Sequence, residues 1–493
     1  MFSKHRFIIV HYLSRHNRRC STVVTATTAT TTVGSTSLQA TTTSPNKTVL
    51  LHKPSSRYNT LRYNYRAFSS SPSSSSSSFS SGEITPSPPP PPPSPLPITS
   101  FTEDEIMIQE AVRSWSKQVL NPIKVRQMDN ESKICPIVLK DLFTQGFMGI
   151  EIDPEKYDGG SGLSFTSSCI IIEELARMDP SIAILVDIHN TCIINAIRCW
   201  GSKQLKKQFL SKLATTSVSS FCLSESESGS DAFSLKTTAI QSKKSKAEKS
   251  KSNDNESYHY IINGTKMWIS NAKDASTLLV FANVAPSLGY KGITAFVLDK
   301  KNGTITIGIP EKKLGLKASS TCTIHFENVK IPSSQILGEI GFGYKYCIEI
   351  LNEGRIGIAA QQLGIAKACL YDIALPYMKE RKQFNTSISE FQGMEHQYAQ
   401  IATEIHAVEL MTYNACRRKE HGMPFIKEAS MVKLYSAQIA EKTASKTIEW
   451  LGGIGYTQDV LAEKFYRDCK VGSIYEGTTN IELQTIAKLL RSE

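Results

Sequence analysis

The sequence of 493 residues lacks the spacings that mark a metal site or a disulfide framework. Its eleven cysteines occur singly, with no Cys-x-x-Cys pair, and its ten histidines show no metal-ligand spacing. We therefore predict no metal site and expect reduced thiols in a reducing compartment. No apolar run approaches the roughly 18 residues that a membrane-spanning helix needs, and the run from Phe7 to Val10 is far too short. The sequence thus predicts no membrane span.

Acidic residues are missing from the first 82 positions, which hold ten Lys or Arg. The remaining chain carries 46 basic and 45 acidic residues, so the net charge of +11 comes from the N-terminal segment. A folded part without excess charge has no field that would attract a polyanion. This charge distribution argues against nucleic acid as a partner.

The first hundred residues divide into two segments. Residues 1–68 are basic, rich in Ser and Thr and free of acid, which is typical of a mitochondrial transit peptide. A tail without a targeting role is the alternative. Residues 69–100 contain a serine tract and an unbroken proline run, and we predict a disordered linker. A PxxP ligand is a second reading of that run.

The rest of the chain changes from helical to β and back to helical character. Thr102 and Glu105 have the spacing of a capping box, which predicts a helix start, and apolar stretches within 170–197 predict buried helices. Asn263-Gly264 between two apolar runs predicts a hairpin with a type I′ turn. Further strands are expected at 278–283, 293–298, 305–309 and 323–326, a solvated surface loop at 241–257, and breaks between C-terminal helices at 422–424 and 452–455.

A dinucleotide-binding fingerprint is also absent. No Gly-x-Gly-x-x-Gly follows a predicted strand, and Gly452-Gly453-Ile454-Gly455 does not fit one. The sequence therefore does not predict a dinucleotide-binding site of the Rossmann type.

Five segments then match one family in order. They are Phe221 to Asp231, Lys266 to Ser270, Arg381 to Phe384, Glu449 to Gly453 and Ile474 to Asn480. From about residue 101 to 493 the chain resembles the acyl-CoA dehydrogenases. The resemblance implies an α+β protein with an N-terminal helical domain (101–217), a small middle β-barrel or sandwich domain (218–338) and a C-terminal four-helix bundle (339–493). Segments 146–151, 313–321 and 352–361 resemble the short/branched-chain members.

The resemblance implies α,β-desaturation of an acyl-CoA thioester, in which a base removes the α proton and FAD accepts the β hydrogen as hydride. Glu476 stands at the position of the base, and its apolar approach, Ile474-Tyr475, should raise its pKa by desolvation. Some members carry the base on an earlier helix, where this chain has Gly354. The adjacent Glu353 stays a second candidate.

The resemblance also assigns binding residues. FAD contacts fall on Phe221, Cys222, Leu223, Ser224, Glu225, Gly229, Ser230, Trp268, Ile269, Ser270, Arg381, Gln392, Glu449, Trp450, Leu451, Gly452, Gly453, Thr478, Thr479 and Asn480. Substrate contacts fall on Ser230, Tyr290, Tyr344, Asn352, Glu353, Gly354, Arg355 and Gly477. Arg381 and Gln392 resemble residues that reach the FAD of a neighbouring subunit, which implies a homo-oligomer, by analogy a tetramer.

Two positions depart from the family pattern. Glu227 places an acid in a loop that faces phosphates in the family, so it must point away or weaken binding. Asn385 replaces a glycine, and asparagine is among the few residues that tolerate positive φ.

The implied function is that of a dehydrogenase in the mitochondrial matrix that passes electrons to electron transfer flavoprotein. The implied substrate is 2-methylbutyryl-CoA, an intermediate of isoleucine breakdown, with isobutyryl-CoA and short straight chains as alternatives. An acyl-CoA oxidase of the same fold and a non-catalytic assembly relative are the competing hypotheses.

Overall fold

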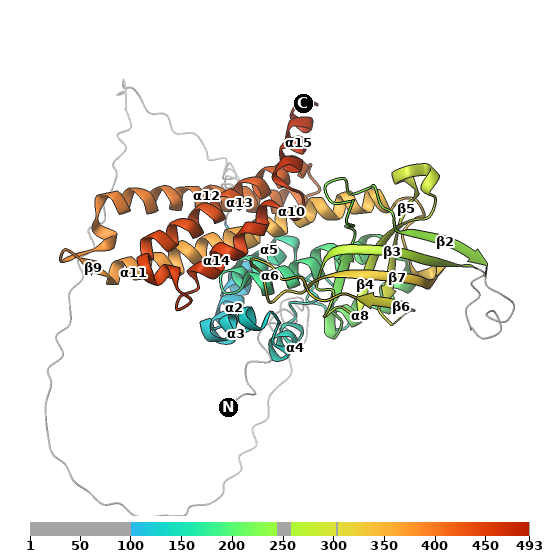
Figure 1. The fold of residues 1–493 in the computed structure, drawn as a ribbon, viewed down its shortest axis with the longest axis horizontal. Coiled ribbons are helices and arrows are strands. Elements are labelled where there is room, and N and C mark those ends of the chain that lie inside the picture. The colour runs from blue at the N-terminus through green and yellow to red at the C-terminus, as the bar shows by residue number, and fades with distance from the viewer. Residues whose placement is uncertain (1–99, 244–257, 302–303, 493) are drawn as a thin grey trace, which may run out of the picture. The chain divides into compact units, whose positions relative to one another are not determined.

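The computed structural model describes residues 100–243, 258–301 and 304–492. The predicted transit peptide, all but the last residue of the predicted linker, and residues 244–257 of the predicted surface loop lie outside this range. Within it, helices precede and follow a β region, as the sequence predicts (Figure 1).

The N-terminal region is helical. Its first helix begins with the predicted capping box: Thr102 Oγ1 accepts from the Glu105 amide at 3.2 Å, and Glu105 Oε2 accepts from the Thr102 amide at 2.9 Å. The helices are α2 (Glu103–Val119), α3 (Pro122–Glu131), α4 (Pro136–Thr144), α5 (Phe165–Ala176), α6 (Pro180–Asp187), the π-helix η2 (Ile188–Ile194), α7 (Asn195–Trp200) and α8 (Lys203–Thr215).

The stretch from α6 to α7 corrects one expectation. Pro180–Trp200 is long and apolar enough to cross a membrane, with a mean hydropathy of 1.4, and 89% of that window is buried inside the protein. Asp187, His189 and Asn190 interrupt the apolar residues, so the sequence contains no unbroken apolar run of this length. The prediction of buried helices within 170–197 is confirmed. His189 contacts the Met148 and Leu213 carbonyl oxygens through Nε2 at 3.1 Å. Such satisfied polar groups belong to a core helix.

One eight-stranded sheet forms the middle region, with the order β6-β7-β3-β2-β4-β5-β8 and β1 paired with β4. Its strands are β1 (Ser219–Cys222), β2 (Thr238–Lys243), β3 (Tyr258–Ser270), β4 (Thr277–Asn283), β5 (Ile293–Asp299), β6 (Thr304–Ile307), β7 (Thr321–Pro332) and β8 (Ile336–Leu337). His189 connects this sheet to the helices, because its Nδ1 accepts from the Ser219 amide at 3.2 Å.

The predicted hairpin at Asn263-Gly264 is wrong. β3 is one continuous strand of 13 residues, paired with β2 on one side and β7 on the other. The β3–β7 register shifts between Ile262 and Gly264, and a Cβ at Gly264 would collide with Thr237. The glycine therefore serves a bulge and a close approach of two strands. Residues 241–243, predicted as loop, extend β2.

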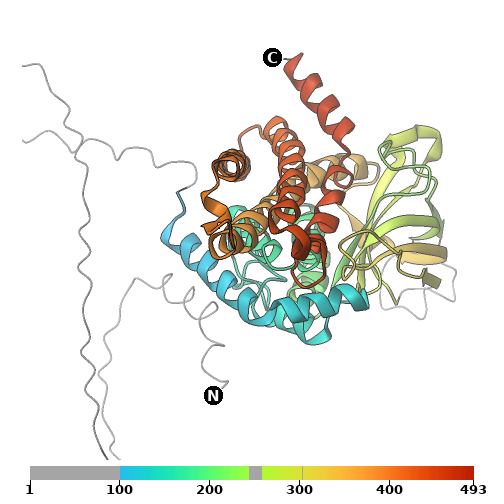
Figure 2. The ribbon, with the colours of Figure 1, turned by 60° about the vertical axis from the view of Figure 1, so that its left-hand side comes forward.

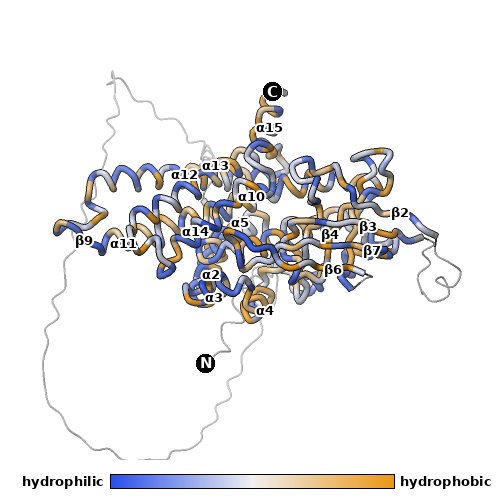
Figure 3. The backbone as a smooth tube through the Cα atoms, in the orientation of Figure 1, coloured by the Kyte–Doolittle hydropathy of each residue, from blue (hydrophilic) through white to orange (hydrophobic). Residues whose placement is uncertain are grey.

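The C-terminal region is again helical. Its elements are α10 (Gly343–Lys367), the π-helix η5 (Ala368–Ala374), α11 (Leu375–Glu380), the short strands β9 (Lys382–Gln383) and β10 (Thr386–Ser387), α12 (Gln392–Glu420), α13 (Ile426–Leu451), η7 (Gly452–Tyr456), α14 (Ala462–Cys469), η8 (Lys470–Ser473) and α15 (Thr479–Leu490). Both predicted helix breaks are confirmed. The helices α10, α12 and α13 lie side by side, and apolar and polar residues alternate along them (Figures 1 and 3).

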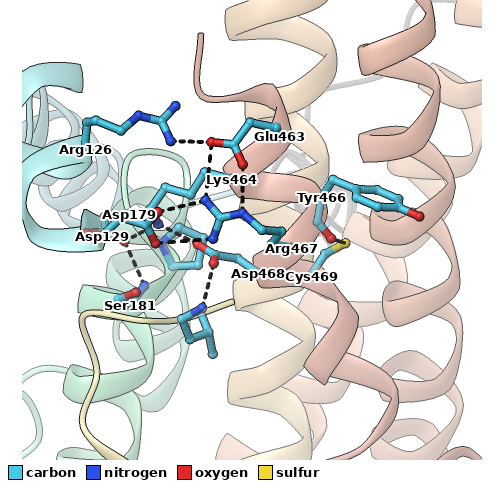
Figure 4. A network of polar contacts seen from close by, with 12 residues as sticks. Arg126, Asp129, Asp179, Ser181, Glu463, Lys464, Tyr466, Arg467, Asp468 and Cys469 are labelled. Carbon is cyan, nitrogen blue, oxygen red and sulfur yellow. Dashed lines mark hydrogen bonds and ion pairs between the residues drawn. The ribbon is translucent and has the colours of Figure 1, made fainter. Parts of the chain in front are cut away.

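A polar network on α14 joins the three regions (Figure 4). The buried Lys464 Nζ contacts Asp179 Oδ1 at 2.9 Å and Asp468 Oδ2 at 2.5 Å. Asp468 Oδ1 accepts from the Leu316 amide at 2.6 Å. Arg467 adds an ion pair to Asp129 of α3 at 2.8 Å. The site therefore lies in a scaffold whose N-terminal, middle and C-terminal parts are fixed to one another.

Candidate active site

Glu476 lies in the turn between η8 and α15. Its Oε2 is buried, and among the described residues this oxygen has no hydrogen-bond partner. A Cβ at Gly354 of α10 would lie 2.7 Å from the same oxygen. The glycine at 354 therefore makes room for the carboxylate of Glu476.

The backbone at Glu476 is strained. Its φ is 51°, and the following Gly477 has a φ of 102°. Residues other than glycine seldom adopt positive φ unless the surroundings hold them there. Here Lys433 of α13 donates to the Gly477 carbonyl oxygen, and Thr478 caps α15 by accepting from the Ile481 amide at 3.4 Å.

Burial is the dominant influence on the pKa of the Glu476 carboxylate. It raises the pKa of Glu476 to about 7, while Lys433 and Arg355 lower it and Glu482 raises it. Arg355 Nε pairs with Glu482 Oε1 at 2.9 Å and Arg355 Nη1 donates to Asn352 Oδ1 at 2.6 Å. The sequence identified Arg355 but missed Lys433 and Glu482, which belong to no motif.

A second buried carboxyl lies one helical turn away. A Cβ at Gly357 would collide with Asp187 of α6, so Gly354 and Gly357 each accommodate one carboxyl on the same face of α10. Thr191 Oγ1 donates to Asp187 Oδ1 at 2.7 Å. Burial raises the pKa of Asp187 to about 8. Nothing local in the sequence signals this residue.

Glu353 has different neighbours from Glu476. Its Oε2 lies 3.4 Å from both Asn195 Nδ2 and Lys419 Nζ. Burial raises its pKa, and Lys419 acts in the opposite direction. Glu353 thus has a cation and an amide as neighbours, whereas Glu476 Oε2 has no hydrogen-bond partner among the described residues.

The loop after β1 is built on Lys266 of β3. This buried lysine contacts the Leu223 carbonyl oxygen at 2.9 Å and Glu225 Oε1 at 2.8 Å. Glu225 also accepts from the Lys236 and Thr237 amides at 2.7 and 3.1 Å. Its carboxylate thus shapes the loop and is not free for a cofactor. Cys222 and Leu223 are buried, Ser224 is half-buried, and Gly229, Ser230 and Glu227 are exposed.

Trp268 faces away from the core beside this loop. Its side chain is 56% exposed and its φ is 62°, at a register shift between β3 and β7. The Met267 amide donates to the Ser224 carbonyl at 2.8 Å, which joins the tryptophan's strand to the loop. An exposed aromatic face beside hydroxyls and amides suits a planar heteroaromatic ring. Ile269 is buried and Ser270 is half-buried.

The remaining predicted residues fall into three groups. Tyr290 and Tyr344, predicted to contact substrate, meet edge to face at 4.9 Å. Arg381, Gln392, Glu449, Gly452, Gly453 and Asn480 are exposed, while Phe221 and Thr479 are half-buried. Trp450 and Leu451 are buried in the helical core, so their side chains contribute packing.

Two further expectations concern single features. Asn385 has a φ of 63° in the β9–β10 turn, so it does adopt the conformation that a glycine would. Across the described parts of the chain, no group of three His, Cys, Asp or Glu side chains could hold a metal ion.

Family models match the chain in three consecutive parts. Acyl-CoA dehydrogenase N-terminal, middle and C-terminal domains match residues 102–217, 220–329 and 341–490. These ranges fall within the helical, β and helical regions of the structure.

Individual proteins agree. The mitochondrial short/branched chain specific acyl-CoA dehydrogenase of Rattus norvegicus is 51% identical over 80% of this chain and 88% of its own length. The probable short/branched chain enzyme of Dictyostelium discoideum is 50% identical over 79% and 91%. Among solved structures, butyryl-CoA dehydrogenase from Megasphaera elsdenii has a TM-score of 0.74 and 30% identity, and covers 80% of this chain and 99% of its own.

The residues present fit the cofactor of that family, which is FAD. The half-exposed Trp268 and the hydroxyls of Ser224 and Ser270 suit the ring system, and a Cβ at Gly229, Gly452 or Gly453 would meet open space. Glu476 supplies a buried carboxylate oxygen that has no hydrogen-bond partner among the described residues. Sequence, fold and site agree that the chain belongs to the acyl-CoA dehydrogenase family, whose members carry out FAD-dependent dehydrogenation of acyl-CoA thioesters.

Proposed function

We propose that this chain oxidises short branched-chain acyl-CoA thioesters, foremost 2-methylbutyryl-CoA, to the 2-enoyl-CoA. The observation that carries the proposal is the buried, unpartnered Oε2 of Glu476 above Gly354. The names of the relatives at about 50% identity support the branched substrate. We place the enzyme in the mitochondrial matrix, with electron transfer flavoprotein as acceptor.

In this reaction Glu476 removes the α proton of the thioester. A base works best when its pKa lies near the working pH, and burial brings the pKa of Glu476 to about 7. Bound FAD supplies the acceptor for the hydride that leaves the β carbon. Gly354 keeps the space in front of the carboxylate open, and Trp268 with Ser224 and Ser270 orients the ring.

We further propose that two or more copies complete each site, with a tetramer as the assembly. Arg381 and Gln392 follow α11, separated from Gly354 by about 40 Å of nearly continuous helix. Helix α15 projects from the other helices (Figures 1 and 2), and its Leu483 and Leu490 are about half exposed. A second copy would cover these leucines and accept Arg381.

The first test mixes the FAD-loaded protein with 2-methylbutyryl-CoA without oxygen and follows the visible absorption of the flavin. We expect fast bleaching with this thioester and slower bleaching with octanoyl-CoA and glutaryl-CoA. Isobutyryl-CoA and butyryl-CoA should overlap with it, because one methyl group changes binding by only about 1–3 kcal/mol. A yellow protein that no thioester bleaches would refute the proposal, and fast return of colour in air would indicate an oxidase.

Glu476→Gln provides the matched variant. It keeps the shape of the side chain but cannot accept the proton, so we expect full FAD content and flavin reduction slower by about 100-fold or more. Glu353→Gln tests the second candidate for the base and should slow flavin reduction much less than Glu476→Gln does. A Glu476→Gln protein that reduces its flavin at the normal rate would exclude Glu476 as the base.

A further inference from the structure

Lys433 is a buried cation in direct contact with the turn that presents Glu476. Its side chain lies within α13 at 1% exposure, and its Nζ donates to the Gly477 carbonyl oxygen. That carbonyl belongs to Gly477, the second of two consecutive turn residues with positive φ; the first is Glu476. A conformation this unfavourable for glutamate persists when its surroundings hold it.

Two other helices close around the same turn. Glu482 of α15 is fully buried, and its Oε1 occupies the place where a Cβ on Gly477 would have to go. Arg355 of α10 holds that oxygen through Nε at 2.9 Å. Lys433, Arg355 and Glu482 therefore enclose the turn from α13, α10 and α15.

We propose that Lys433 is a positioning residue for Glu476: it holds the Glu476–Gly477 turn through the Gly477 carbonyl and supplies positive charge beside the carboxylate. The inference rests on the proposed function, because it presumes that Glu476 takes the substrate's α proton. It adds a residue that acts through Glu476 and touches neither substrate nor cofactor.

The charged groups around Glu476 determine the direction in which its pKa should shift when one of them is removed. The ionisable groups that face Glu476 are Lys433 of α13, Arg355 and Cys347 of α10, Glu482 of α15, Asp187 of α6, Cys192 of η2 and the adjacent Tyr475. Against the rise caused by burial, Lys433 lowers the pKa of Glu476 and Glu482 raises it. Burial lowers the pKa of Lys433 itself to about 8, so the lysine is mostly charged at neutral pH.

Neutralising Lys433 and neutralising Glu482 should therefore shift the pKa of Glu476 in opposite directions. Lys433→Met removes positive charge and should raise the pKa of Glu476. Glu482→Gln removes negative charge with nearly the same shape and should lower it. A residue with a purely structural role would not produce shifts of opposite sign.

The experiment measures anaerobic flavin reduction by 2-methylbutyryl-CoA in FAD-loaded protein from about pH 6 to about pH 9. For Lys433→Met we expect FAD content and KM within about twofold of wild type and a half-maximal pH about one unit higher. Reduction at pH 7 should then be about fivefold slower, because a rise of the Glu476 pKa from about 7 to about 8 lowers the ionised fraction at pH 7 from about one half to about one tenth. For Glu482→Gln the half-maximal pH should fall.

Lys442→Met is the matched control. Lys442 lies on the same helix but is solvent-accessible and pairs with Glu404 at 2.7 Å. This substitution changes the same residue type on another face of α13, so rate and pH profile should stay at wild-type values.

An unshifted profile in Lys433→Met, or shifts of the same sign in both variants, would overturn the inference. If Lys433→Met does not fold, the near-isosteric Glu482→Gln decides, and an unshifted profile there has the same meaning. If the thioester bleaches the wild-type flavin but the pH profiles of the variants are unshifted, only the proposed role of Lys433 is refuted. If no thioester bleaches the wild-type flavin, both the proposed function and the inference about Lys433 are refuted.

Discussion

Asp187 is a carboxyl that the protein buries in its uncharged form. It lies 2% exposed, with the Thr191 hydroxyl as a hydrogen-bond donor and Gly357 against it. Burial raises its pKa from 3.8 to about 8, so at pH 7 the folded protein holds a proton that the unfolded chain releases. Its contribution to stability is complete below about pH 4 and is lost as the pH rises toward 8.

Asp187→Asn should remove this dependence. We expect the thermal midpoint of the variant to rise relative to wild type as the pH increases from 4 to 8, by at most about 1.4 kcal/mol of stability per pH unit. Differential scanning calorimetry at several pH values measures the gap. Asp153→Asn, at an exposed ion pair with Lys156, should show no such widening. A gap that is constant with pH would mean that Asp187 is ionised in the folded protein.

At the scale of elements, the short helix α14 holds distant parts of the chain together. Lys464 is fully buried between Asp179, which caps α6, and Asp468, which holds the loop before β7. Removing one partner from such a buried pair leaves charges without compensation, which costs several kcal/mol.

Lys464→Met should therefore lower the free energy of unfolding by about 3–5 kcal/mol. Guanidinium unfolding followed by tryptophan fluorescence checks this value. Lys470→Met is the control, because Lys470 directly follows α14 and pairs with Glu441 in solvent. It should change stability by less than about 1 kcal/mol. Equal effects of the two substitutions would show that the α14 network is not the junction described above.

Local patterns predicted some elements well and others badly. Thr102 and Glu105 need only each other to form a capping box, so their spacing sufficed. Asn263-Gly264 has the composition of a turn, but β2 and β7 pair on both sides of it and the close contact with Thr237 makes it a bulge. Whether a turn or a bulge forms at this position depends on strands that lie elsewhere in the sequence.

The active site shows the same division. Glu476, Trp268 and the loop from Phe221 to Ser230 could be predicted as candidates because each belongs to a motif. Lys433 and Asp187 could not, since Lys433 precedes its partner by 44 residues and Asp187 lies on a different helical region. The side chains that shift the pKa of a buried carboxylate are those that lie near it in the folded chain. A single sequence does not show which residues become neighbours.

At the scale of the whole molecule, the proposed assembly has a direct test. If Arg381 serves the site of a neighbouring copy, Arg381→Gln and Glu476→Gln each disable every site in a homo-oligomer. Co-expression should restore part of the activity, because a site with Glu476 from one variant and Arg381 from the other is complete. Flavin reduction by the purified mixed oligomer measures it.

Mixing the two proteins after separate purification is the control, and it should restore nothing if subunits do not exchange. Activity that stays absent after co-expression, in oligomers shown to contain both variants, would place Arg381 and Glu476 in the same copy's site.

The α14 network also determines when the fold can be completed during synthesis. Lys464 lies 285 residues after Asp179, and Arg467 lies 338 residues after Asp129. A nascent chain emerges from the ribosome N-terminus first, so the early helices are made long before the cations that neutralise their buried carboxylates. A product truncated before α14 keeps the acids without their counter-charges. We expect such fragments to be cleared by proteolysis rather than to persist as a folded N-terminal domain.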